Sequence, residues 1–150
     1  MKDFIFHTAE WYRANPPPTV VPLIGPYLLV EEGAMIVFGL PEAGKSYLVL
    51  QMATCLASGS DFLYFPVREA VNVAYLQGEL SQAELQKRWD CNFPDVALKR
   101  LHMCTEFGKT LDSISPNTFI EHLNSLEIRA LIIDPVHEFM SGSASNDEHT

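Results

Sequence analysis

Short apolar runs alternate with segments of helical spacing along the 150 residues of this chain. The apolar runs have the length and the β-branched or aromatic content of buried strands, and they cover residues 34–38, 71–76 and 130–133. Residues 98–103 are a further strand candidate, although they are more polar. Helical spacing follows most of them, at residues 47–58, 81–90 and 116–126. This alternation predicts an α/β fold, a parallel sheet flanked by helices.

The ends of the predicted helices carry local signals. Gly59 follows the first helix, as expected of a helix terminator. Ser81 and Glu84 have the spacing of a capping box, and Ser115 precedes a proline suited to the first helical position. A short amphipathic helix is also expected within residues 3–14, ahead of a stiff proline-rich connector. We therefore divide the chain into residues 1–21, an N-terminal segment with its connector, and residues 22–150, one domain or part of one.

Residues 39–46, GLPEAGKS, fit the pattern of a phosphate-binding loop and lie between a predicted strand and a predicted helix. Gly39 and Gly44 permit the close backbone approach that such a loop needs, and its N–H groups form an anion nest at the helix N-terminus. Lys45 is placed to reach the β- and γ-phosphates, and Ser46 to ligate Mg²⁺. The alternative is a glycine turn that binds nothing. The predicted nucleotide contacts are Gly39, Pro41, Glu42, Ala43, Gly44, Lys45, Ser46 and Tyr47.

Two carboxylates follow predicted strands at the sheet edge where ligands bind in open α/β folds. Asp134 comes directly after an apolar run and has the pattern of a Walker B aspartate, which would hold Mg²⁺ through water opposite Ser46. Its alternative is an Asp-Pro turn starter. Glu79 follows the second strand, where a carboxylate could polarise an attacking water as a catalytic base; its alternative is a solvated turn residue, and Glu138 is the second candidate base.

Composition narrows the functional classes. The net charge is −9 and no cluster of Lys and Arg occurs, which weighs against a basic surface that coats duplex DNA. No apolar run approaches the length of about 18 residues that spans a bilayer. The N-terminus lacks the features of a secretory signal, and the three cysteines have no C-x-x-C spacing. We expect a cytoplasmic protein with reduced thiols and no membrane association.

Two further patterns are weak. Residues 108–110, GKT, repeat the end of a phosphate loop, but Met103 stands where the first glycine is needed. We expect a turn there. Among the five histidines, His137 is close enough to Asp134 in sequence to reach the site, although a lone histidine is more often a packing or surface residue.

Together these residues resemble the RecA-like ATPases, and most closely the RepA-type hexameric replicative helicases and their AAA_25 relatives. The resemblance runs from Pro22 to Asn146 and rests on GLPEAGKS, YLVLQMATCLASG, VAYLQGEL and LIIDP. It implies ATP and Mg²⁺ as ligands, Glu79 as the base that activates water, Lys45 and Ser46 as loop residues, and Asp134 as the metal ligand. It also implies a homo-oligomer, a hexameric ring in the full-length protein, with single-stranded DNA bound through C-terminal loops that these residues lack.

In RecA-like sheets a later strand lies between the phosphate-loop strand and the Walker B strand. The expected order is therefore 98–103, 71–77, 129–133, a gap, and then 34–38. From this we expect residues 22–150 to be the N-terminal portion of the ATPase domain, which binds nucleotide better than it hydrolyses it.

Three functions remain open at this point. The first is an ATP-hydrolysing motor that acts as a helicase in DNA replication or recombination. The second is a nucleotide-dependent regulatory or binding module of the same fold. The third is a phosphotransferase, which is less favoured because no Arg-rich lid segment follows.

Overall fold

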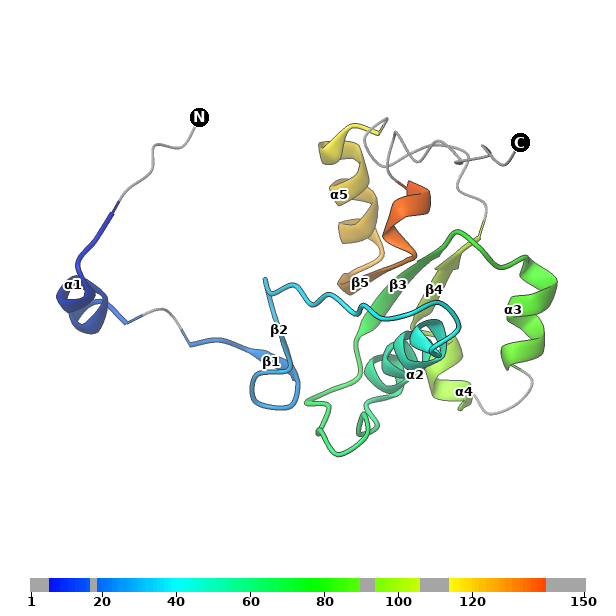
Figure 1. Cartoon of the computed structure of the whole chain (residues 1–150), viewed down its shortest axis with the longest axis horizontal. Coiled ribbons are helices and arrows are strands. Elements are labelled where there is room, and N and C mark those ends of the chain that lie inside the picture. Colours follow the sequence, from blue (N-terminus) through cyan, green and yellow to red (C-terminus); the bar gives the residue numbers. More distant parts are fainter. Residues whose placement is uncertain (1–5, 17–18, 90–93, 106–113, 140–150) are drawn as a thin grey trace.

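The computed structural model describes residues 6–16, 19–89, 94–105 and 114–139 (Figure 1). These residues form two small sheets and a set of helices. In chain order the elements are α1 (Ala9–Ala14), β1 (Pro22–Ile24), β2 (Leu29–Val30), α2 (Lys45–Ser58), β3 (Asn72–Gln77), α3 (Gln82–Trp89), α4 (Asp95–Leu98), β4 (Leu101–Cys104), α5 (Pro116–Ser125), β5 (Ile128–Asp134) and the 3₁₀ helix η2 (Val136–Phe139).

The main sheet has three parallel strands in the order β4-β3-β5. This confirms the predicted α/β fold and the predicted order of these strands. In the register, Tyr75 of β3 pairs with Met103 of β4 and with Ile132 of β5. The predicted strand at residues 98–103 begins later than expected. Leu98 ends α4, and β4 begins only at Leu101.

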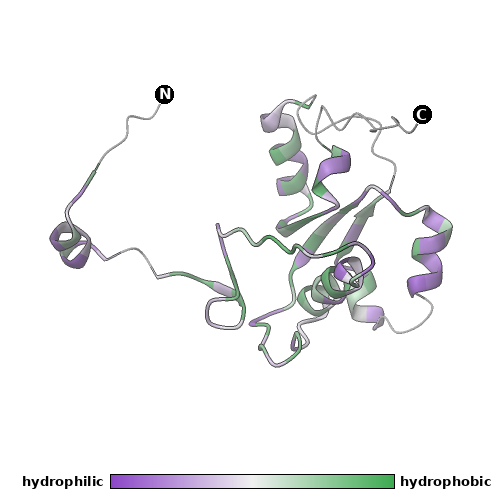
Figure 2. Cartoon of the chain, viewed as in Figure 1, coloured by the Kyte–Doolittle hydropathy of each residue, from purple (hydrophilic) through white to green (hydrophobic). Residues whose placement is uncertain are grey.

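The hydrophobic core lies between α2 and the sheet. The buried residues of α2 occupy its inner face and pack against β3, whose residues from Val73 to Gln77 are buried. Figure 2 shows α2 and the strands as mostly apolar, whereas α3 is mostly polar. Gly59 ends α2 in the left-handed conformation, and its N–H donates to Cys55 O at 2.8 Å. The predicted glycine terminator is thus confirmed.

The apolar segment 34–38 is not a strand, which corrects the prediction. Residues 33–39 run as an irregular trace between β2 and α2 (Figure 1). Ile36 is 84% exposed and Phe38 is 89% exposed, while Met35 packs partly against the core. A strand needs a partner for its backbone N–H and C=O groups, and among the described residues no strand pairs with this segment. Apolar content alone therefore did not determine its structure.

Other elements differ in detail from expectation. The antiparallel β1–β2 hairpin was not predicted. Gly25, directly after β1, begins the turn of this hairpin and has φ +55°. The first helix begins only at Ala9, because Thr8 caps it by accepting a hydrogen bond from Trp11 N–H at 3.1 Å. The capping box is confirmed, since the Ser81 and Glu84 side chains exchange hydrogen bonds with each other's backbone N–H groups.

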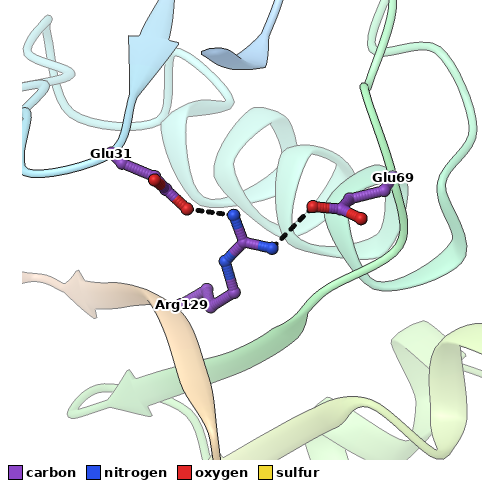
Figure 3. A network of polar contacts seen from close by, with 3 residues as sticks. All are labelled: Glu31, Glu69 and Arg129. Atoms are coloured by element: carbon purple, nitrogen blue, oxygen red, sulfur yellow. Dashed lines mark hydrogen bonds and ion pairs between the residues drawn. The ribbon is translucent and has the colours of Figure 1, made fainter. Parts of the chain in front are cut away.

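Three segments that are far apart in the sequence meet at Arg129, near the start of β5 (Figure 3). Its guanidinium donates to Glu69 Oε1 at 2.6 Å and also to Glu31 Oε1. The hydrogen bond from Arg129 holds the pKa of the Glu69 carboxyl below its usual range. The cluster connects the segment after β2 and the segment before β3 to the sheet. It is partly exposed, so each ion pair contributes only modestly.

Replacing Arg129 by methionine is expected to lower the melting temperature at pH 7 by a small amount, on the order of one degree. The Glu69 pKa is depressed in the folded state, so the stabilisation is fully present above the ordinary pKa of the unfolded carboxyl and is lost as pH falls through the lower folded-state pKa. Thermal melts from pH 7 to pH 3 should show the difference from wild type shrinking in acid. Arg13→Met on α1 controls for the charge, and a pH-independent difference would contradict this account.

Candidate functional site

The glycine loop enters α2 as the sequence predicts. Gly44 is the N-cap of α2 and has φ +81°, a left-handed conformation that favours glycine. A Cβ added at Gly44 would meet nothing within 4 Å, so backbone conformation rather than space explains the glycine. Glu42 also has a positive φ, +59°, and the Ala43 N–H donates to Leu40 O at 3.3 Å. The loop is therefore a tight turn whose backbone departs from ordinary angles at two positions.

The Lys45 side chain folds across this loop. Its Nζ donates to Gly39 O at 3.0 Å and to Leu40 O at 2.8 Å. A lysine ammonium has three donors, so within the described part of the chain one donor has no protein acceptor. These hydrogen bonds hold the Lys45 ammonium beside the carbonyl groups of the first two loop residues. The side chain is positioned by the loop itself and can still donate to an added anion.

The N-terminus of α2 offers further donors. The first N–H groups of any helix lack intrahelical partners, and Gly44 has no side chain to cap them. The helix dipole adds partial positive charge at the same place over a helix of 14 residues. Residues 40–44 are exposed, whereas Lys45 and Ser46 are half-buried. Free N–H groups, the dipole and an ammonium at one exposed helix end are the features of an anion site.

Asp134 and Gln77 end neighbouring strands of the sheet. They are register partners at the carboxyl ends of β5 and β3, and the Gly78 N–H donates to Asp134 O at 3.1 Å. The Gln77 side chain is 2% exposed. In the amide orientation that satisfies both neighbours, its nitrogen donates to Asp134 O at 2.5 Å and its oxygen accepts from the Leu80 N–H at 3.0 Å. These hydrogen bonds to its carbonyl oxygen therefore hold the Asp134 main chain at the sheet edge where we predicted it.

The Asp134 carboxylate has a partner that the sequence did not predict. The Tyr75 hydroxyl donates to Asp134 Oδ2 at 2.6 Å. Burial raises the pKa of Tyr75, and the hydrogen bond to Asp134 raises it further, so this hydroxyl stays protonated as a donor. The only sequence signal was a tyrosine inside a buried strand, since a buried phenol usually needs a hydrogen-bond partner.

The two candidate bases lie close to the same strand end. Glu79 is exposed and follows Gly78 directly. A Cβ at Gly78 would lie 2.7 Å from Glu138 Cβ, so η2 packs against the glycine and brings Glu138 beside it. His137 Nε2 lies 3.4 Å from Glu138 Oε1, in an exposed pair. The structure thus brings Asp134, Glu79 and Glu138 to one edge of the sheet.

Tyr47 has a neighbour from α3. The Arg88 guanidinium lies over the Tyr47 ring, 4.4 Å from its centroid, in cation–π geometry. Tyr47 is 62% exposed, so the far side of its ring is accessible. This contact connects α3 to the start of α2, and sequence spacing gave no sign of it.

The donor set fits Mg²⁺ that is held jointly with a nucleotide. Within residues 6–16, 19–89, 94–105 and 114–139, no three His, Cys, Asp or Glu side chains gather as a protein-only metal site. Mg²⁺ is usually bound by one or two protein oxygens together with substrate phosphates and water, and Ser46 and Asp134 supply oxygens of that kind. The GKT segment at 108–110 lies outside the described residues.

A protein-family model matches almost the whole chain. The family model AAA_25, described as an AAA domain, matches residues 3–150. No curated protein and no solved structure matches the chain. In the part of the chain that the structure describes, no helix combines the length and the apolar character needed to cross a membrane.

Proposed function

Because the chain belongs to the AAA domain family, we propose that it binds ATP with Mg²⁺ at the start of α2 and hydrolyses it. The family supports a nucleotide-binding, ATPase-type domain in general. The observation that carries the assignment to residues is the loop 39–46, in which a left-handed glycine opens α2 and the Lys45 ammonium spans the loop carbonyls. Gly39, Pro41, Glu42, Ala43, Gly44, Lys45, Ser46 and Tyr47 would contact the nucleotide.

Each residue has a distinct task in this proposal. The N–H groups at the start of α2 and the Lys45 ammonium bind and orient the phosphates. The Ser46 hydroxyl and the Asp134 carboxylate would hold Mg²⁺, which neutralises charge that develops on the phosphoryl oxygens. Glu79 accepts a proton from the attacking water. The Tyr47 ring, backed by Arg88, offers an aromatic face near the loop.

We further propose that this activity drives a RecA-like, helicase-type motor that works as a ring-forming homo-oligomer on single-stranded DNA. The support is the strand order β4-β3-β5, which matches the order expected for that branch, together with an acid after β3. The alternative is a nucleotide-dependent regulatory module. The net charge of −9 and the lack of Lys and Arg clusters in this sequence favour the regulatory module.

ATP hydrolysis measured with and without single-stranded oligothymidylate separates the two proposals. For a motor, DNA is expected to raise the turnover rate several-fold, because nucleotide and DNA sites are coupled. Tight Mg²⁺-dependent ATP binding with a turnover rate that DNA does not change would instead favour the regulatory module. Absence of any nucleotide binding would contradict both.

A further inference from the structure

We propose that Tyr75 is a positioning residue for the metal-binding carboxylate of Asp134. Through its hydroxyl, Tyr75 fixes which oxygen of Asp134 is presented to Mg²⁺. The inference rests on the proposed function, because it assigns Asp134 to the metal. It concerns a residue on the central strand β3, outside the loop 39–46.

The sheet register brings the two side chains to one face. Tyr75 pairs with Ile132 on β5, and Asp134 lies two residues farther along the same strand. Side chains two residues apart point to the same side of a sheet, so Tyr75 and Asp134 are diagonal neighbours. A tyrosine is long enough to cover this diagonal, and its hydroxyl ends 2.6 Å from Asp134 Oδ2.

The phenol is a rigid support for the carboxylate. Tyr75 is 2% exposed, belongs to the hydrophobic core and lies on the strand between β4 and β5. Its hydroxyl therefore has little freedom to move. A carboxylate has about four acceptor sites, and the Tyr75 hydroxyl occupies one of those on Oδ2. This short hydrogen bond restricts rotation of the carboxylate and favours Oδ1 as the oxygen presented to a metal ion or its water.

The backbone around Asp134 is held as well. The Gly78 N–H donates to the Asp134 carbonyl oxygen, and the Gln77 side chain does so in the amide orientation that satisfies its neighbours. The main chain is thus fixed by β3 and the side chain is fixed by Tyr75. Ligand orientation by a hydrogen-bonded neighbour is a general means by which proteins set metal affinity. A hydroxyl that only satisfied its own hydrogen bond would affect stability but not the response to Mg²⁺.

Tyr75→Phe removes the hydroxyl and keeps the ring. ATP affinity of the protein is measured by calorimetry over a series of Mg²⁺ concentrations and in EDTA. We expect the variant to need about 10- to 100-fold more Mg²⁺ for the half-maximal gain in ATP affinity, as for the loss of a residue that orients a metal ligand. Its affinity in EDTA should equal that of wild type. Tyr64→Phe, at a side chain that is 97% exposed, is the matched control and should change neither value.

A double-mutant cycle tests whether Tyr75 acts through Asp134. In an Asp134→Asn background, Tyr75→Phe is expected to have no further effect on the Mg²⁺ requirement. Equal effects in both backgrounds would overturn the inference, as would a Tyr75→Phe protein that melts earlier but keeps the wild-type Mg²⁺ requirement.

A second measurement does not depend on losing the hydroxyl. With 3-fluorotyrosine at position 75, the ¹⁹F resonance is expected to shift when Mg²⁺ is added to the ATP-bound protein, and to stay in place in the Asp134→Asn variant. A ¹⁹F resonance whose chemical shift does not change on addition of Mg²⁺ would overturn the inference, while the proposed function would stand. Absence of Mg²⁺-dependent ATP binding by the wild-type protein would overturn both.

Discussion

Replacing Lys45 by alanine is expected to weaken ATP binding by about 10- to 100-fold or more, because hydrogen bonds to charged groups contribute about 1.5–3 kcal/mol and 1.4 kcal/mol corresponds to a factor of ten. The Lys45 ammonium already lies across the loop, on Gly39 O and Leu40 O. A phosphate can therefore take up its remaining donor without a large rearrangement of the side chain. Titration of a fluorescent ATP analogue in the presence of Mg²⁺ measures the loss.

Two features make this variant informative. Lys45 is only half-buried and its ammonium donates to two loop carbonyls, so the fold and its melting temperature should change little on substitution. Lys99→Ala removes the same charge from an exposed position after α4 and should leave ATP affinity unchanged. If Lys45→Ala keeps the wild-type affinity, the assignment of the phosphate loop to residues 39–46 is wrong.

Local patterns predicted the parts of the fold that depend on neighbouring residues. The loop, the helix that begins at Lys45 and the glycine that ends it follow from short-range rules on capping and backbone conformation. The pairing of β3 with β4 and β5 followed from the resemblance to RecA-like sheets, which implied the order of these strands. Asp134 and Glu79 could be placed at one edge because the carboxyl ends of parallel strands meet there.

Long-range contacts were not predictable in the same way. Residues 34–38 have the composition of a strand, but a strand also needs a partner, and composition carries no information about the partner. The Tyr75–Asp134 hydrogen bond joins residues 59 positions apart and depends on the exact register of β3 and β5. The Arg129–Glu31 pair spans 98 positions. Such pairs depend on tertiary geometry, which a single sequence does not contain.

Replacing Glu79 by glutamine is expected to lower the rate of ATP hydrolysis by about 10²-fold or more while ATP affinity changes little, as for the loss of a general base. Glutamine has the same shape as glutamate but cannot accept the proton of the attacking water. Because Glu79 is exposed, the substitution should not disturb the fold. Single-turnover hydrolysis of radiolabelled ATP, with binding measured separately, resolves the rate even where turnover is slow.

Glu138 is the natural comparison, because η2 brings it to the same strand end through its packing on Gly78. The two acids differ in their surroundings. The Glu138 Oε1 atom lies 3.4 Å from His137 Nε2, whereas Glu79 lies two residues past the end of the central strand. Glu138→Gln is therefore expected to keep most of the hydrolysis rate. If Glu79→Gln hydrolyses ATP as fast as wild type and Glu138→Gln does not, then the base comes from η2. The water would in that case be activated from the β5 side of the sheet edge.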